Sequence, residues 1–179
     1  MHKKAKAFLE YGTYVLILVL VLFIVPEYIL EKDGIKGTSM ENNFHDGEHI
    51  LVEKVSRYFG GPDRFDVIVF TKKHGVQERT YIKRVIGLPG ETVQIVDGQI
   101  LIDGAVLKEN YGKEMITDEE AGLAAEPMAL GEDEYFVLGD NRNNSIDSTD
   151  YKVGAVKKEE LDGVVFFRIA PWSAFGTVK

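Results

Sequence analysis

Apolar residues form one long run near the N-terminus and short alternating segments over the rest of the chain. No charged residue lies between Tyr11 and Pro26, and an α-helix rising about 1.5 Å per residue would cover roughly 24 Å of a hydrocarbon core about 30 Å thick. Extending this helix over residues 8–30 spans the whole core and places Tyr14 and Tyr28 near the interfaces, where amphipathic rings are common. The pattern therefore predicts a transmembrane anchor over residues 8–30, which Pro26 kinks or ends.

A cleaved secretory leader is the alternative, because lysines precede the apolar run. It is the weaker interpretation, since the run is longer than the apolar core of a usual leader and no small-x-small pair follows it directly. Gly37 and Ser39 have that spacing but lie too far downstream. Lysine before the span and an acidic excess after it predict that residues 1–7 stay in the cytoplasm and that residues 31–179 form an extracytoplasmic domain. We therefore expect a single-pass protein of the cell membrane.

Beyond the anchor, β-branched and alternating segments separated by Gly, Pro and Asp predict short strands. The clearest alternation, over residues 92–106, is interrupted by Asp97-Gly98 and Asp103-Gly104, which are two-residue hairpin signals and predict a three-stranded meander. The fold class we expect is mostly β, an antiparallel sheet after one transmembrane helix. The further predicted strands are residues 49–55, 66–70, 80–86, 134–138 and 164–169, with a turn at 72–77, a loop at 139–150 and a helical turn at 157–161.

Residues 107–132 are polar and acidic, and they interrupt the run of predicted strands. We interpret them as a small variable insertion with one short helix over residues 118–125. After the anchor, the remaining chain is long enough for one compact domain with its own core, but not for a second full domain.

Charge and residue types exclude several classes of function. The chain has 21 Lys and Arg against 29 Asp and Glu, for a net charge of -8, and it has no basic cluster beyond its first residues. This argues against nucleic-acid binding, so contact with the lipid bilayer is expected to come from the apolar span. With no cysteine, disulfides and thiolate zinc sites are impossible. His45 and His49 have metal-like spacing with Asp46 and Glu48, but they fall on a predicted turn and strand, so we expect no metal and no cofactor.

Ser39 and Lys83 are candidates for a nucleophile and its base. A serine hydroxyl needs a base to take its proton, and a lysine serves as that base only if burial lowers its pKa from about 10.4 towards neutrality. In the predicted strand, Lys83 shares a face with Tyr81 and Val85, an apolar setting that favours the neutral amine, whereas Arg84 points to the other face. On spacing alone this is weak evidence for a dyad, since most Ser and Lys residues are ordinary surface groups.

Three segments resemble the signature boxes of bacterial type I signal peptidases, which are Ser/Lys peptidases of the S26 type. They are GTSM at residues 37–40, YIKRVIGLPGE at 81–91 and GDNRNNSIDS at 139–148. Their order and the preceding anchor also match, RFDVIVF at residues 64–70 is similar to a further box, and the resemblance covers nearly the whole chain. The closest likeness is to the Gram-positive enzymes.

The resemblance implies a membrane-bound serine endopeptidase that removes signal peptides from exported preproteins by cutting after a small residue. It makes Ser39 the nucleophile, Lys83 the general base and Ser145 the donor or acceptor that orients the lysine amine. The backbone N–H of Ser39 would hold the oxyanion, and Gly37 lacks the hydroxyl that supplies a second donor in some relatives.

Further positions take supporting roles by the same resemblance. The ones that brace the site through ion pairs are Arg84, Asp140 and Asp147, although ordinary solvated charges are the alternative. Shallow pockets for small side chains at the first and third positions before the cut would be lined by Ile35, Met40, Phe44, Ile50, Tyr81 and Ile82. For Ile50 and Ile82, core packing is an equal alternative.

The sequence departs from the family pattern at several positions. Asn42 and Asn43 stand where proline and threonine are usual, which loosens the turn that aims Ser39, and Phe65 replaces a usual glycine. These changes resemble the divergent signal-peptidase-like proteins that assist pilus assembly. The alternative function is therefore an assembly factor with weak or no proteolytic activity and pilin subunits as partners. A self-cleaving repressor with a Ser/Lys dyad is a third class, but the chain has no DNA-binding segment.

Thr149 stands where the family has an arginine. We therefore expect Asp147 to lack its usual partner and to pair with Arg142 or Lys152 instead.

Overall fold

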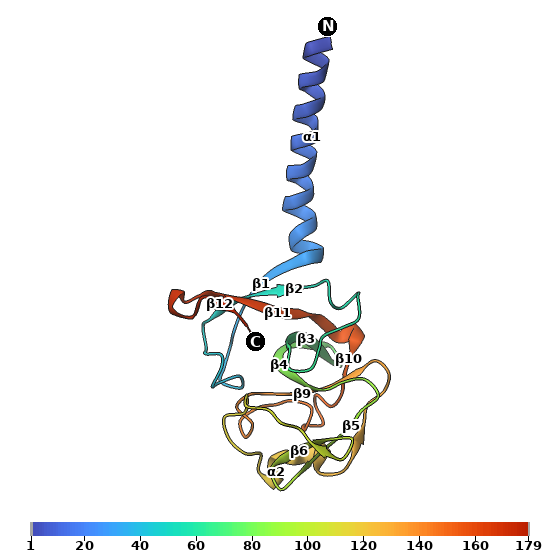
Figure 1. Cartoon of the computed structure of the whole chain (residues 1–179), viewed down its shortest axis with the longest axis vertical. Helices are drawn as coiled ribbons and strands as arrows, with labels where there is room; N and C mark the ends of the chain where they lie inside the picture. Colours follow the sequence, from blue (N-terminus) through green and yellow to red (C-terminus); the bar gives the residue numbers. More distant parts are fainter. Residues whose placement is uncertain (1, 179) are drawn as a thin grey trace.

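The structure is a computed structural model that describes residues 2–178, without the side chains of residues 2–5, 24–26 and 74. A long N-terminal helix stands apart from a β domain (Figure 1). The helix α1 (His2–Ile24) passes into a single π-helical turn, η1 (Val25–Ile29). The α-helical part thus ends just before Pro26, as predicted. Met1 of the expected tail, and the side chains of its lysines at positions 3 and 4, lie outside what is described.

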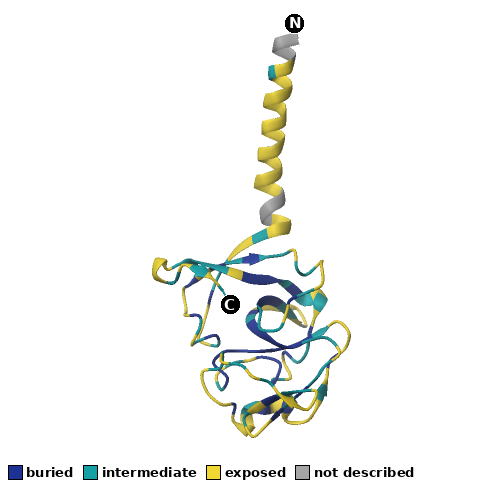
Figure 2. Cartoon of the chain, viewed as in Figure 1, coloured by how far each residue is buried: buried dark blue, intermediate teal, exposed yellow. Residues whose placement is uncertain are grey.

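The helix α1 is exposed over most of its length (Figure 2), and the exposed side chains from Val15 to Phe23 are all apolar. Its 18-residue stretch Lys6–Phe23 is long and apolar enough to cross a membrane, and none of it is buried against the domain. A helix that is apolar all round needs an apolar surrounding, because each exposed methylene costs about 0.8 kcal/mol in water. The helix therefore fits the membrane anchor that the sequence predicts.

The main sheet of the domain has eight strands, in the order β1-β2-β11-β3-β4-β9-β10, with β12 paired to β11. Every pairing is antiparallel. The mostly β, antiparallel fold class is confirmed. The strands are β1 Leu30–Gly34, β2 His49–Glu53, β3 Val67–His74, β4 Gln77–Gly87, β9 Glu134–Leu138, β10 Val156–Lys157, β11 Leu161–Ala170 and β12 Gly176–Thr177.

A smaller four-stranded sheet has the order β7-β6-β5-β8 and lies at the far end of the domain from the anchor (Figure 1). Asp97-Gly98 and Asp103-Gly104 form its two turns, and all four residues have positive φ angles, as two-residue hairpin turns of this kind require. The predicted meander is confirmed, and β8 is added to its edge. The strands are β5 Thr92–Val96, β6 Gln99–Ile102, β7 Ala105–Val106 and β8 Met128–Ala129.

Helix outside the anchor is short. The predicted helix over residues 118–125 is present as α2 (Asp118–Ala121) followed by the 3-10 turn η2 (Gly122–Ala125). The helical turn predicted near residue 157 is the 3-10 turn η3 (Lys158–Glu160), and a last one, η4 (Trp172–Ala174), follows β11.

The main sheet differs from the expectations in two places. The turn expected at residues 72–77 is present but shorter, since β3 and β4 stay in register up to the pair His74 and Gln77 and leave a two-residue turn at Gly75 and Val76. Most polar side chains near this turn are exposed, because the hairpin of β3 and β4 extends beyond the core. The strand β1 was not predicted because its sequence, LEKDG, is mostly charged. Charge is common on an edge strand, where it prevents pairing with other chains.

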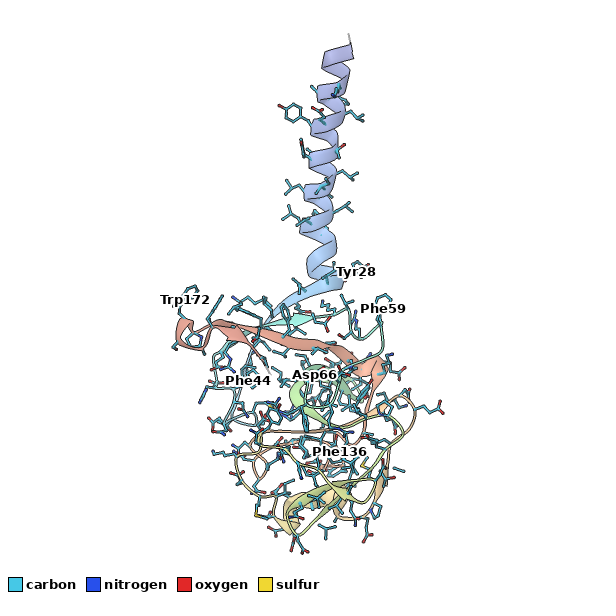
Figure 3. All side chains as sticks on the ribbon, viewed as in Figure 1. Tyr28, Phe44, Phe59, Asp66, Phe136 and Trp172 are labelled. Atoms are coloured by element: carbon cyan, nitrogen blue, oxygen red, sulfur yellow. The ribbon has the colours of Figure 1, made fainter. Side chains whose placement is uncertain are left out.

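The core consists of three clusters of buried apolar side chains. One includes Phe136 and side chains of the small sheet, and another includes Phe44, which lies in the segment that joins β1 to β2 (Figure 3). On the side of the domain nearest the anchor, Phe59 and Trp172 are exposed. The third cluster, around Phe70 and Val85, fills the centre of the main sheet and fixes β4, the strand that carries Lys83.

Candidate active site

Ser39 lies on a tight turn between β1 and β2. Gly37 precedes it with φ 85°, a conformation that favours glycine, and its N–H donates to Asp46 Oδ1 over 2.7 Å. The N–H of Phe44 donates to the carbonyl of Met40 over 2.9 Å, which closes one helical turn. Because Met40 and Phe44 are buried in the cluster below, this turn is anchored to the core and holds the partly exposed Ser39 above it.

The strand β4 brings Lys83 against Ser39. The lysine is only 3% exposed, and its Nζ donates to Ser39 Oγ over 2.7 Å and to the carbonyl of Ile82 over 2.9 Å. Strand alternation places it between Tyr81 and Val85, which are both buried, as expected. When the amine is neutral, the same contact lets the serine O–H donate to Nζ, which is the geometry that proton removal needs.

Burial lowers the pKa of Lys83 from 10.5 to about 8. The negative charges of Asp147 and Asp140 oppose this shift, but they do not cancel it. A pKa near 8 leaves roughly a tenth of the amine neutral at pH 7, far more than for an exposed lysine. The apolar setting predicted from strand periodicity therefore has the expected electrostatic consequence.

Arg84, on the opposite face of β4, forms a buried ion pair with Asp140. Its Nε and Nη2 donate to the two carboxylate oxygens over 2.8 and 2.7 Å, and neither residue is exposed. Nη1 donates to the carbonyl of Phe65 over 2.8 Å, and the guanidinium lies 3.9 Å from the ring centroid of Tyr111. Arg84 and Asp140 thus join β4 to the loop after β9 directly behind Lys83.

Asn43 connects the turn that carries Ser39 to this ion pair, a role that the sequence did not predict. Its Nδ2 donates to Asp140 Oδ2 over 2.9 Å and to the carbonyl of Tyr111 over 3.1 Å. The backbone N–H of Asn141 donates to the carbonyl of Ser39 over 3.1 Å. The only signal in the sequence was that position 43 departs from the family pattern.

Asp147 is buried and satisfied locally, so the expectation that Arg142 or Lys152 pairs with it is wrong. Its carboxylate accepts hydrogen bonds from the N–H of Gly139 over 2.9 Å and from the Thr149 hydroxyl over 2.9 Å. The threonine that replaces the family arginine therefore satisfies the carboxylate itself, since a hydroxyl two residues away can reach it. Arg142 instead forms an ion pair with Glu109 over 2.8 Å.

Ser145 lies at this site, but it does not form the expected hydrogen bond with Lys83. Its hydroxyl is buried and has no hydrogen-bond partner among the residues that the structure describes. The lysine amine donates to Ser39 and Ile82 instead. Gly139 allows this close packing, because a Cβ there would collide with both the Ser145 side chain and the Ser39 carbonyl.

A groove of about 770 Å³ opens beside Ser39 and Lys83. Four of the six residues expected to line substrate pockets lie on its wall, namely Ile35, Met40, Tyr81 and Ile82. The other two, Phe44 and Ile50, are 1% and 0% exposed and are absent from its lining. Both point into the cluster below the turn, so core packing replaces the pocket role expected for them.

The segment with metal-like histidine spacing is held by ion pairs. Glu48 lies 3.3 Å from His45 and 3.1 Å from Arg168. Among the side chains that the structure describes, no group of three or more His, Asp or Glu is arranged to hold a metal ion.

Comparison with known proteins identifies relatives over the whole chain. A family model described as signal peptidase, peptidase S26, matches residues 8–172. Signal peptidase I P of Bacillus subtilis subsp. natto is 32% identical over 100% of this chain and 97% of its own length. Signal peptidase I of Leptolyngbya laminosa is 36% identical over 85% of this chain and 74% of its own length.

A crystal structure of a signal peptidase I from Enterococcus faecalis is 37% identical, covers 57% of this chain and 95% of that chain, and has a TM-score of 0.46. Signal peptidase I T of Bacillus subtilis is 32% identical over 99% of this chain and 93% of its own length. The family match and the identity over the full length agree with the three signature boxes in the sequence. The chain therefore belongs to the S26 family of signal peptidases and is a hydrolase of the signal peptidase I type.

Proposed function

We propose that this protein removes signal peptides from exported preproteins, with Ser39 as nucleophile and Lys83 as general base. The single observation that carries the assignment is the 2.7 Å contact between the Ser39 hydroxyl and a lysine amine that is 3% exposed. The relatives are named signal peptidase I, which supports the same substrate class.

The geometry supports a two-step acyl transfer. In the first step, neutral Lys83 takes the proton of Ser39 Oγ as this oxygen attacks the carbonyl carbon of the scissile bond. The lysine ammonium then gives that proton to the nitrogen of the departing mature chain, and the C–N bond breaks. In the second step, a water attacks the serine ester with Lys83 again as base. The proton returns to Ser39 Oγ, and the signal peptide leaves with a new carboxyl end.

Other residues hold these groups in place. The backbone N–H of Ser39 donates to the oxyanion, and Gly37 offers no side-chain donor beside it. Arg84, Asp140 and Asp147 act as positioning residues, because they fix the backbone around the dyad through buried hydrogen bonds. Ser145, whose hydroxyl has no hydrogen-bond partner among the described residues, is the group available to orient the lysine once the proton has moved.

Specificity for a small residue before the cut follows from the groove beside the dyad. Its wall of Ile35, Met40, Tyr81 and Ile82 is apolar and packed on the core, so it excludes large side chains rather than adapting to them.

The anchor places this chemistry at the membrane surface. We assign residues 1–7 to the cytoplasm, residues 8–30 to the span and residues 31–179 to the extracytoplasmic domain, with 107–132 as its insertion. A precursor held in the same bilayer meets the active site at a high effective concentration, which lowers the affinity that the groove must supply.

The test uses the full-length protein in detergent or lipid with a precursor that carries a signal peptide. We expect cleavage at one bond, and loss of that cleavage in Ser39→Ala and in Lys83→Ala. The exposed Ser173→Ala and Lys152→Ala variants are matched controls and should cleave normally. Cleavage that survives either dyad substitution would exclude the assignment.

The alternative is a signal-peptidase-like factor for pilus assembly, and the departures at Asn42 and Asn43 are the observation that favours it. The same experiment decides between the two roles. Binding of pilin subunits by an unmutated chain that cleaves no precursor would favour assembly.

A further inference from the structure

The segment that joins β1 to β2, residues 35–48, carries Ser39 and is closed at its base. The N–H of Ile35 donates to the carbonyl of Glu48 over 2.8 Å, and the N–H of Gly47 donates to the carbonyl of Ile35 over 3.0 Å. We call this segment the serine loop. Both bonds lie at its base, so the position of Ser39 above the core depends on contacts that are made further along the loop.

Arg168, on β11, approaches the serine loop from the core side of the sheet. It lies opposite Ile50 of β2, and side chains that lie opposite each other in an antiparallel pair are on one face of the sheet. Ile50 is fully buried, and the Arg168 guanidinium lies 4.7 Å from the ring centroid of Phe44. A charge in such surroundings is costly unless it is paired, so the partners of this guanidinium decide what Arg168 contributes.

The guanidinium joins the base of the serine loop to its middle. Its Nε lies 3.1 Å from Glu48 Oε2, and Nη1 donates to Glu48 Oε1 over 3.3 Å. Its Nη2 donates to the backbone carbonyl of Asn43 over 2.7 Å. The Glu48 side chain is only 5% exposed and that of Arg168 18%, so salt screens this pair less than a surface ion pair. Because the guanidinium is planar and rigid, these contacts fix the Asn43 carbonyl relative to Glu48.

Asn43 is therefore held from two sides. Its side chain donates to Asp140 and to the carbonyl of Tyr111, whereas its own carbonyl accepts the bond from Arg168. The contact with Asp140 ties the serine loop to the ion pair behind Lys83, and the contact with Arg168 ties it to β11. Ties to two separate parts of the fold restrict the movement of the loop at this residue.

We propose that Arg168 is a positioning residue, which keeps Ser39 at reacting distance from Lys83. It does so by holding the Asn43 carbonyl while it is paired with Glu48. This inference rests on the proposed function for its effect on catalysis. Loss of the contact would let the turn shift and would lengthen the 2.7 Å distance between Ser39 Oγ and Lys83 Nζ, and the rate of attack falls steeply with such a displacement. Arg168 does not line the groove beside the dyad, so substrate binding should be nearly unaffected.

The test measures cleavage of a precursor peptide by the full-length protein. Arg168→Met should lower kcat about tenfold and change KM less than about twofold, because it displaces Ser39 and leaves the groove intact. Arg168→Lys keeps the positive charge near Glu48, but its single nitrogen cannot hold Glu48 and the Asn43 carbonyl in the geometry of a guanidinium. It should therefore give a kcat between those of the unmutated protein and Arg168→Met.

Lys72→Met is the matched control for a lost ion pair. The Lys72 amine also bridges a carboxylate and a carbonyl, since it donates to Glu160 Oε2 over 2.6 Å and to the carbonyl of Ala155 over 2.8 Å. Lys72 does not line the groove beside the dyad, so Lys72→Met should keep the kcat of the unmutated protein. An equal fall in kcat in Lys72→Met and Arg168→Met, or an unchanged kcat in Arg168→Met, would overturn the inference and leave the peptidase assignment standing.

Hydrogen exchange separates the inference from the proposed function, because it needs no substrate. In Arg168→Met, the backbone amides of residues 38–44 should exchange about fivefold faster than in the unmutated protein, whereas Lys72→Met should leave them unchanged. If the unmutated chain cleaves no precursor, these rates decide. Faster exchange in residues 38–44 supports the positioning role of Arg168, and unchanged exchange overturns it. If Arg168→Met does not fold, Arg168→Lys takes its place in both measurements.

Discussion

The amine of Lys83 can act as a base only when it is neutral, and its burial sets the pH at which this happens. Because burial lowers the pKa to about 8, the neutral fraction rises tenfold per pH unit below that value and levels off above it. We therefore expect kcat/KM for a precursor peptide to rise between pH 6 and 8 and to reach a plateau, with an inflection at about 8. A rate profile over pH 6 to 10 measures this. An inflection near the ordinary lysine pKa would contradict the role of Lys83 as a desolvated base.

The same burial should make Lys83 costly for stability. In the unfolded chain the lysine keeps its ordinary pKa, so below pH 8 both states bind the proton and the folded state holds a buried charge at a cost of about 3 kcal/mol. Replacing it in Lys83→Met removes this cost but also loses two hydrogen bonds, each typically worth about 1 kcal/mol and about 1.5 to 3 kcal/mol when the donor is charged. We therefore expect the free energy of unfolding of Lys83→Met, relative to that of the unmutated protein, to be about 2 to 3 kcal/mol more favourable at pH 7 than at pH 10.

The sign of the pH dependence follows from proton binding. Between about pH 8 and 10.5 the unfolded chain binds one proton more than the folded chain at this residue, so the stability of the unmutated protein rises with pH. The relative stability of Lys83→Met should therefore fall over this range. Denaturant unfolding of both proteins at pH 7 and pH 10 measures the difference, and a difference that is the same at both values would show that the amine is not buried as a charge.

The turn from Gly37 to Phe44 is the element that aims the nucleophile, and Asn43 ties it to the Asp140 carboxylate and to the carbonyl of Tyr111. Asn43→Ala should lower kcat about tenfold with little change in KM, because a small displacement of Ser39 affects the reacting distance more than substrate binding. The matched control is Asn42→Ala, since Asn42 is exposed and its side chain forms no such hydrogen bond with the residues that the structure describes. A fall in kcat that is equal in both variants would indicate that the turn is simply intolerant of change.

Elements whose pattern is local could be predicted from the sequence. The meander follows from two Asp-Gly pairs, and Lys83 follows from strand alternation and the resemblance of its box. The strand β1 could not be predicted, because it is made of charged residues and exists only through pairing with β2. The hydrogen bond between the Thr149 hydroxyl and Asp147 could not be predicted either, because the replacement of an arginine by a threonine does not indicate what the new hydroxyl contacts. Phe65 is an intermediate case. Its position was recognised as one that favours glycine, and its φ of 75° gives the physical reason.

At the scale of the whole molecule, the anchor and the domain are joined without a linker. The strand β1 begins at Leu30, directly after η1. Lys54 follows the partner strand β2, and its backbone N–H donates to the carbonyl of Ile29 over 2.9 Å. The Lys54 amine also reaches Glu31 over 2.7 Å. These contacts hold the end of the helix against the sheet (Figure 1), so a bilayer around α1 would orient the groove as well as tether it.

The orientation of the chain in the membrane is tested most directly by single cysteines, because the natural sequence has none and gives no background. We expect Ser173→Cys, on the exposed turn η4, to react with a membrane-impermeant maleimide in intact cells, since positive charge before a span favours a cytoplasmic N-terminus and hence an outer domain. Ala7→Cys should react only after the membrane is permeabilised. The opposite pattern would place the domain in the cytoplasm, where emerging signal peptides of exported preproteins could not reach Ser39 after crossing the bilayer.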